Sequence, residues 1–98
     1  MFIAHVEFRV TDSERDAALK VLINEAATVR GMPGNLKFQA FLNPEQPNTI
    51  EIMHEWQSEE GFTAYLASDS FASVGAALGP QMLAPPVSKR FIANPVDA

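Results

Sequence analysis

The feature that most constrains the fold of this chain is a strict two-residue alternation of apolar and mainly polar side chains near its start. The apolar positions are Phe2, Ala4, Val6, Phe8 and Val10. Successive side chains of a β-strand point to opposite faces of a sheet, so this period predicts a strand with one buried face. Leu36–Asn43 and Thr49–Trp56 alternate in the same way, and Val87–Ile92 is expected to form a last strand.

A helix is expected between the first two strands, from Thr11 to about Arg30. The apolar stripe along it comprises Ala18, Leu22, Ala26 and Val29, which have the spacing of one helix face. Thr11 and Glu14 have the spacing of a capping box, in which each side chain binds the backbone N–H of the other residue. Gly31-Met32-Pro33-Gly34 ends the pattern, because Gly and Pro are typical of helix C-termini.

The second and third strands are joined by Pro44–Asn48, a turn with two prolines, so they are expected to form an antiparallel hairpin. Ser58 can cap a further helix. Asp69 or Ser70 is expected to interrupt that helix before a short helix over Phe71–Leu78. The resulting order, β-α-β-β-α-β, is that of ferredoxin-like α+β proteins, in which helices cover one face of an antiparallel sheet.

The other face of this sheet is expected to be half apolar, because it carries Ile3, Phe41 and Met53. Such a face favours a second subunit packed against it, so we expect a homodimer. A chain of 98 residues buries only about 60–65% of its unfolded surface, which also favours a partner. We interpret residues 1–98 as one domain whose last residues, 93–98, form a loose tail.

Composition excludes several classes of function. The chain is 47% apolar and 19% charged, as ordinary globular domains are. Its net charge is −5 and its seven basic residues are scattered, so no stripe for nucleic acid exists. The absence of cysteine excludes disulfides, zinc–thiolate sites, iron–sulfur ligation and a cysteine nucleophile. Charged residues in 1–10 and short apolar runs predict neither signal peptide nor membrane span, so we expect a cytoplasmic protein.

Three stretches, Val29–Leu36, Glu55–Phe62 and Tyr65–Phe71, resemble the antibiotic-biosynthesis-monooxygenase family. The first ends a helix with Gly-Met-Pro-Gly, the second places Trp56 before Ser-Glu-Glu-Gly-Phe, and the third reads Tyr-Leu-Ala-Ser-x-x-Phe. The resemblance implies a dimeric α+β barrel with a pocket between the sheet and helices of each subunit. Some members oxygenate anthrones or quinols with molecular oxygen and neither metal nor flavin. Others degrade haem, are isomerase-like or have no assigned activity.

The sequence departs from this family at Tyr65, where many relatives carry histidine on the second helix. A phenol can donate a hydrogen bond to a substrate oxygen, but its pKa of about 10 makes it a weak base at neutral pH. We therefore consider His54 as the replacement for the acid–base group of those relatives.

His54 and Trp56 lie two positions apart and share one strand face, so both can line the pocket. A neutral imidazole can deprotonate a phenol or hydroquinone, and an indole can stack on an aromatic ring. The resulting electron-rich anion can pass an electron directly to oxygen, so no cofactor is expected. The alternatives are a hydrogen-bonded core histidine, a tryptophan that only packs, and Tyr65 with its hydroxyl at the surface.

Ile52, Phe62 and Phe71 are candidate substrate-binding residues, and the alternative for the two phenylalanines is a place in the core. His5 falls on the strand face opposite to His54 and is assigned to the subunit interface or to solvent. With only these two histidines, on opposite faces, and no cysteine, a metal site has no support.

The sequence therefore predicts a cofactor-independent monooxygenase that uses molecular oxygen on an aromatic quinol or anthrone-like small molecule. The alternative is a non-catalytic dimeric protein that binds an apolar aromatic small molecule in the same pocket. Haem degradation is disfavoured because it needs an axial histidine in the second helical region, and no histidine follows His54. An isomerase or decarboxylating enzyme on the same barrel stays open.

Overall fold

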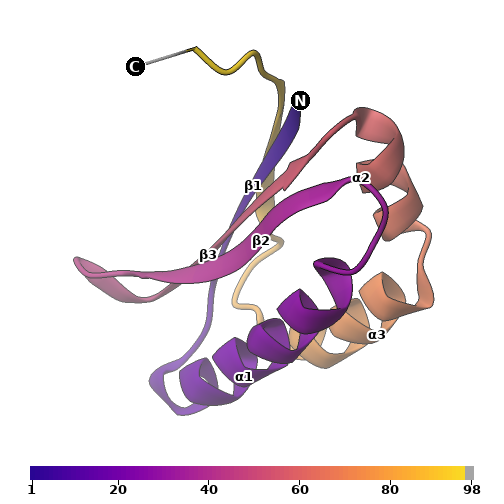
Figure 1. Ribbon diagram of the computed structural model, residues 1–98. Helices are drawn as coiled ribbons and strands as arrows, with labels where there is room; N and C mark the ends of the chain where they lie inside the picture. The colour runs from indigo at the N-terminus through magenta and orange to yellow at the C-terminus, as the bar shows by residue number, and fades with distance from the viewer. Residues whose placement is uncertain (97–98) are drawn as a thin grey trace.

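The computed structural model describes residues 1–96, and it places all the helices on one face of a four-stranded antiparallel sheet (Figure 1). The strands are β1 (Phe2–Arg9), β2 (Asn35–Asn43), β3 (Gln46–Trp56) and β4 (Val87–Ile92). The helices are α1 (Asp12–Val29), α2 (Glu59–Leu66) and α3 (Asp69–Leu78), the last followed by a 3₁₀ turn over Gly79–Gln81. The strand order β2-β3-β1-β4 confirms the ferredoxin-like α+β prediction.

The strand register aligns side chains in rows across the sheet. Phe38 of β2 pairs with His54 of β3, which pairs with Ala4 of β1, which pairs in turn with Arg90 of the edge strand β4. Cross-strand partners project from the same face. This row therefore lies on the helix-covered face, where Phe38, Ala4 and His54 are buried.

Helix α1 packs on the sheet through the predicted stripe of Ala18, Leu22, Ala26 and Val29, all of which are buried. Glu25 lies on the same stripe and is only 6% exposed. A buried carboxylate is costly unless its oxygens are hydrogen-bonded, so this residue needs partners from the neighbouring helices.

Two of the predicted helix caps, at Thr11 and Ser58, lack the side-chain hydrogen bond that was expected of them. The Thr11 side chain does not cap α1, because its Oγ1 lies 3.2 Å from Ser13 Oγ, and the Glu14 N–H donates to the Thr11 carbonyl instead. Ser58 precedes α2 without a side-chain cap bond.

The break between α2 and α3 comes at Ser68, earlier than the predicted Asp69 or Ser70. Ser68 Oγ accepts a hydrogen bond of 3.1 Å from the Phe71 N–H and donates one of 2.6 Å to the Tyr65 carbonyl. One hydroxyl thus bonds both a free backbone N–H at the start of α3 and a free carbonyl at the end of α2.

The N-terminus lies beside the segment that follows β4 (Figure 1). The Met1 ammonium donates to the Ala93 carbonyl at 2.8 Å, and the Ala93 N–H donates to the Met1 carbonyl at the same distance. The expected tail 93–98 is therefore held at its first residue; residues 94–96 form no helix or strand, and residues 97 and 98 lie outside the described part. None of the helices within residues 1–96 combines the length and apolar character that crossing a membrane requires.

The sheet face away from the helices carries Ile3, Phe41 and Met53, as predicted, together with Phe91 of β4, which is half exposed. His5 also lies on this face, where its Nε2 is 2.9 Å from Glu51 Oε1.

Candidate functional site

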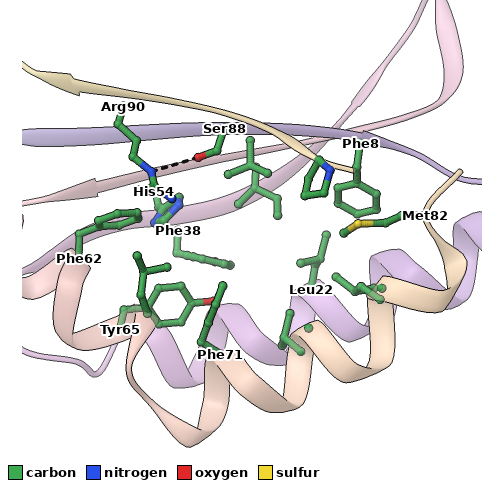
Figure 2. Close-up of a pocket in the computed structure, with 18 residues that line it drawn as sticks. Phe8, Leu22, Phe38, His54, Phe62, Tyr65, Phe71, Met82, Ser88 and Arg90 are labelled. Atoms are coloured by element: carbon green, nitrogen blue, oxygen red, sulfur yellow. Dashed lines mark hydrogen bonds between the residues drawn. The ribbon is translucent and has the colours of Figure 1, made fainter. Parts of the chain in front are cut away.

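A cavity of about 360 Å³ lies between the sheet and the helices (Figure 2). Its walls are mainly apolar: the strands contribute Phe8, Phe38 and Ile52, and the helices contribute Leu22, Phe62, Phe71 and Leu78. The polar side chains on its lining are His54, Tyr65, Ser88 and Arg90. A mainly apolar enclosure with a few polar groups is typical of small-molecule sites.

Five of the six predicted site residues line this cavity: Ile52, His54, Phe62, Tyr65 and Phe71. Trp56 is not among the lining residues. Its side chain is fully buried, and it stacks on the Tyr65 ring with 5.8 Å between the ring centres. Trp56 therefore packs one layer outside the cavity rather than against a ligand.

Trp56 fixes the state of His54 through a buried hydrogen bond. The indole Nε1–H donates to His54 Nδ1 at 2.9 Å. An indole N–H can only donate, so Nδ1 must hold a lone pair, and the proton of the neutral imidazole is carried by Nε2. Burial, the larger cause, and the positive charge of Arg90 together lower the pKa of His54 to about 4. At neutral pH His54 is thus an uncharged ring with an Nε2–H donor.

Arg90, on the edge strand β4, lies at the same end of the cavity as His54 (Figure 2). Its guanidinium carbon sits 4.9 Å from the centre of the Phe62 ring, within cation–π range. Its Nε donates to Ser88 Oγ at 3.4 Å. A positive charge and an imidazole N–H at one end of an apolar cavity suit an oxygen atom that carries or develops negative charge.

Tyr65, on α2, joins the cavity to the buried carboxylate of α1. Its hydroxyl donates to Glu25 Oε2 at 3.0 Å, and Ser70 Oγ of α3 donates to Glu25 Oε1 at 2.5 Å. Burial, the negative charge of Glu25 and this hydrogen bond all raise the pKa of Tyr65. Tyr65 is therefore a neutral phenol throughout the physiological pH range.

Sequence reasoning missed both Glu25 and Arg90. Glu25 follows Leu22 by three residues and precedes Val29 by four, so its place on the buried stripe was a signal that it is not a surface charge. Arg90 follows Ser88 on the strand face that continues the His54 row. Within residues 1–96, no group of three or more His, Asp or Glu side chains is placed to hold a metal ion.

Gly61 of α2 is required by the position of Trp56. A Cβ at this residue would lie 2.9 Å from Trp56 Cε3 and 3.1 Å from the Pro33 carbonyl oxygen. We expect Gly61→Ala to destabilise the protein by about 1–3 kcal/mol through overpacking, although alanine is the better helix former by about 1 kcal/mol. The measurement is denaturant unfolding followed by Trp56 fluorescence.

Gly75→Ala in α3 is the matched control, since a Cβ there meets nothing within 4 Å in the described residues apart from its chain neighbours and its own helix backbone. This variant is expected to be as stable as the parent or more so. Equal stabilities of the two variants would contradict the close contact between α2 and Trp56.

The fold and the cavity define the class of this protein: it is a ferredoxin-like α+β protein with a mainly apolar cavity between its sheet and its helices. A sequence profile described as antibiotic biosynthesis monooxygenase matches residues 1–76. The chain therefore belongs to the antibiotic biosynthesis monooxygenase family. No curated protein matches it.

Solved structures that carry the same family name share the whole fold. The protein from Deinococcus radiodurans has a TM-score of 0.93 at 17% identity, covering 100% of this chain and 97% of its own. The protein from Caulobacter crescentus CB15 has a TM-score of 0.90 at 23% identity, covering 96% and 90%. The protein from Nitrosomonas europaea has a TM-score of 0.89 at 13% identity, covering 95% and 98%. At identities this low, the structural similarity shows a common fold.

Proposed function

We propose that this protein is a monooxygenase that oxidises a small hydroquinone- or anthrone-like aromatic with molecular oxygen and without a cofactor. The observation that carries the proposal is that a neutral His54, with its proton on Nε2, and the positively charged Arg90 line the same end of an apolar cavity. Such a site favours the anion of a phenol or enol over its neutral form. The cavity volume of about 360 Å³ suits a compact ligand, near the lower end of the usual range of small-molecule pockets.

In this proposal the ionised oxygen of the substrate accepts the His54 N–H and faces Arg90. Ile52, Phe62 and Phe71 contact the aromatic rings, and the electron-rich anion reduces oxygen directly. For an anthrone, the CH₂ carbon gains one oxygen atom as a carbonyl, and its two hydrogens leave with the other oxygen atom as water. His54 acts here as a donor and not as the base considered from the sequence, because its Nδ1 lone pair is occupied by Trp56.

The test is oxygen consumption by metal-stripped protein with 1,8-dihydroxyanthrone and a panel of hydroquinones. We expect the parent protein to consume oxygen and His54→Ala to lower kcat by about 10²–10³-fold, the effect of removing one oxyanion donor. His5→Ala is the matched control, since it removes the histidine on the opposite sheet face. A kcat that His54→Ala leaves unchanged would remove His54 from the mechanism.

The second candidate function is a non-catalytic protein that binds the same class of aromatic. The observation in its favour is that neither His54, with its pKa lowered to about 4, nor Tyr65, with its pKa raised, is a base at neutral pH. Quenching of Trp56 fluorescence by the panel, with no oxygen uptake, would establish this function instead.

In either case we propose a homodimer formed through the outer sheet face around Ile3, Phe41, Met53 and Phe91, whose apolar side chains support such an interface.

A further inference from the structure

Glu25 is a buried carboxylate held by two hydroxyls from two other helices. Tyr65 Oη donates from α2 and Ser70 Oγ donates from α3, while Glu25 itself is 6% exposed. Removing a carboxylate from water is expensive, and an apolar side chain would pack three helices together at lower cost. This cost suggests that the charge serves a purpose other than packing.

The position of Glu25 relative to two hollows indicates that purpose. Tyr65 lines the inner cavity, in which the substrate is proposed to lie. Glu25 lines a different hollow of about 430 Å³ between α1 and α3, together with the polar side chains of Asn24, Thr28, Ser70 and Ser73. The Tyr65–Glu25 hydrogen bond of 3.0 Å therefore bridges the helix layer between the cavity and this polar groove.

We propose that Glu25 is the base of the site and receives the substrate's proton through the Tyr65 hydroxyl, then releases it into the groove between α1 and α3. The substrate O–H bond breaks as an O–H bond forms on Tyr65 Oη, and the original Tyr65 proton passes to Glu25 Oε2. Tyr65 is neutral before and after the transfer. One negative charge moves from Glu25 to the substrate oxygen. This proposal rests on the proposed function, because it supplies the base which that mechanism requires.

Four further points support the relay. A phenol oxygen can accept one hydrogen bond while it donates another, as a relay requires. The raised pKa of Tyr65 disfavours a free phenolate, so the two proton movements occur together. The charge that leaves Glu25 arrives at the end of the cavity where Arg90 and the His54 N–H are placed to hold it. The rings of His54 and Tyr65 lie 5.9 Å apart, so one bound aromatic can reach both.

The experiment measures ionisation of a bound phenol and needs no turnover. 4-Nitrophenol is bound under nitrogen at neutral pH, and its absorbance gives the ratio of phenolate to phenol on the protein. We expect Glu25→Gln, which keeps the size of the side chain and removes its basicity, to lower this ratio at least tenfold. Tyr65→Phe, which removes the relay oxygen, should lower it by a similar factor.

Two controls separate the relay from a structural role. 4-Nitroanisole has no proton to give, and its affinity, from Trp56 fluorescence, should be the same in the parent, Glu25→Gln and Tyr65→Phe proteins. Glu51→Gln makes the same change on the outer sheet face, away from the cavity, and should keep the parent ratio. The proposal would be overturned if Glu25→Gln left the phenolate ratio unchanged, or if nitrophenol stayed neutral on the parent protein. It would also be overturned if the variants lost affinity for 4-nitroanisole by the same factor as they lost phenolate. Lack of oxygen uptake would refute the monooxygenase and leave these results unaffected.

Discussion

Trp56→Ala is expected to lower the free energy of unfolding by about 3–5 kcal/mol, the usual cost of truncating a buried tryptophan to alanine. The Trp56 side chain is fully buried, stacks on Tyr65 and fills the space beside Gly61. Its loss also leaves His54 Nδ1 without the indole donor. Guanidinium unfolding followed by far-UV circular dichroism measures the change without depending on tryptophan emission.

Trp56→Phe separates the packing from the hydrogen bond. Phenylalanine keeps most of the ring in place but cannot donate to His54, so we expect a smaller loss of about 1–3 kcal/mol, dominated by one unsatisfied buried acceptor. The same variant frees Nδ1 to carry the imidazole proton, which the ¹⁵N chemical shifts of the His54 ring can report. A Trp56→Ala variant as stable as the parent would show that the ring does not hold α2 against the sheet.

Acid is expected to destabilise the protein through His54. The pKa of this imidazole is 6.5 in the unfolded chain and about 4 in the folded one. Below pH 6.5 the unfolded chain therefore binds a proton that the folded protein does not. The contribution of His54 to stability is fully present above pH 6.5 and is lost as pH falls toward 4. The whole difference corresponds to about 3 kcal/mol, at 1.36 kcal/mol per pKa unit.

The free energy of unfolding should be measured from pH 7.5 to 3.5 in the parent and in His54→Gln, whose amide can still accept from Trp56. The variant should lose the part of the pH dependence that lies between 6.5 and 4. His5→Gln is the matched control and should keep it, because His5 lies on the outer sheet face. Identical pH profiles for the parent and His54→Gln would refute the burial of a neutral imidazole.

The fold was largely predictable because its signals are local. Alternation within Phe2–Val10 and Thr49–Trp56 depends only on neighbouring positions. It places His54 and Ile52 on one strand face, and in the structure that face is the one covered by the helices. The stripe on α1 depends only on helical spacing. The end of α2 was less predictable, since Ser68, Asp69 and Ser70 are all good capping residues and the choice among them depends on the Tyr65 carbonyl.

The site was less predictable because its contacts join distant parts of the chain. Glu25 meets Tyr65 across 40 positions of sequence, and that pairing depends on how α1 and α2 pack. Arg90 reaches the cavity through the register of β4 on β1. Trp56 shares a strand face with His54, but the close approach of Gly61 places the indole against α2, outside the cavity. Periodicity predicts which face of a strand a side chain lies on, but it does not predict whether that side chain lines the cavity or packs behind it.

The two glycines on the cavity wall, Gly75 and Gly79, have a consequence for how this protein can diverge. A Cβ added at either position meets nothing within 4 Å in the described residues apart from its chain neighbours and nearby helix backbone. Larger residues there would take up ligand volume without moving the strands. Under the proposed function, α3 and the turn after it would set the size of the ligand, while the sheet and α1 would govern its ionisation. Substitutions at Gly75 and Gly79 would then change which ligands fit without altering the residues proposed to move the proton.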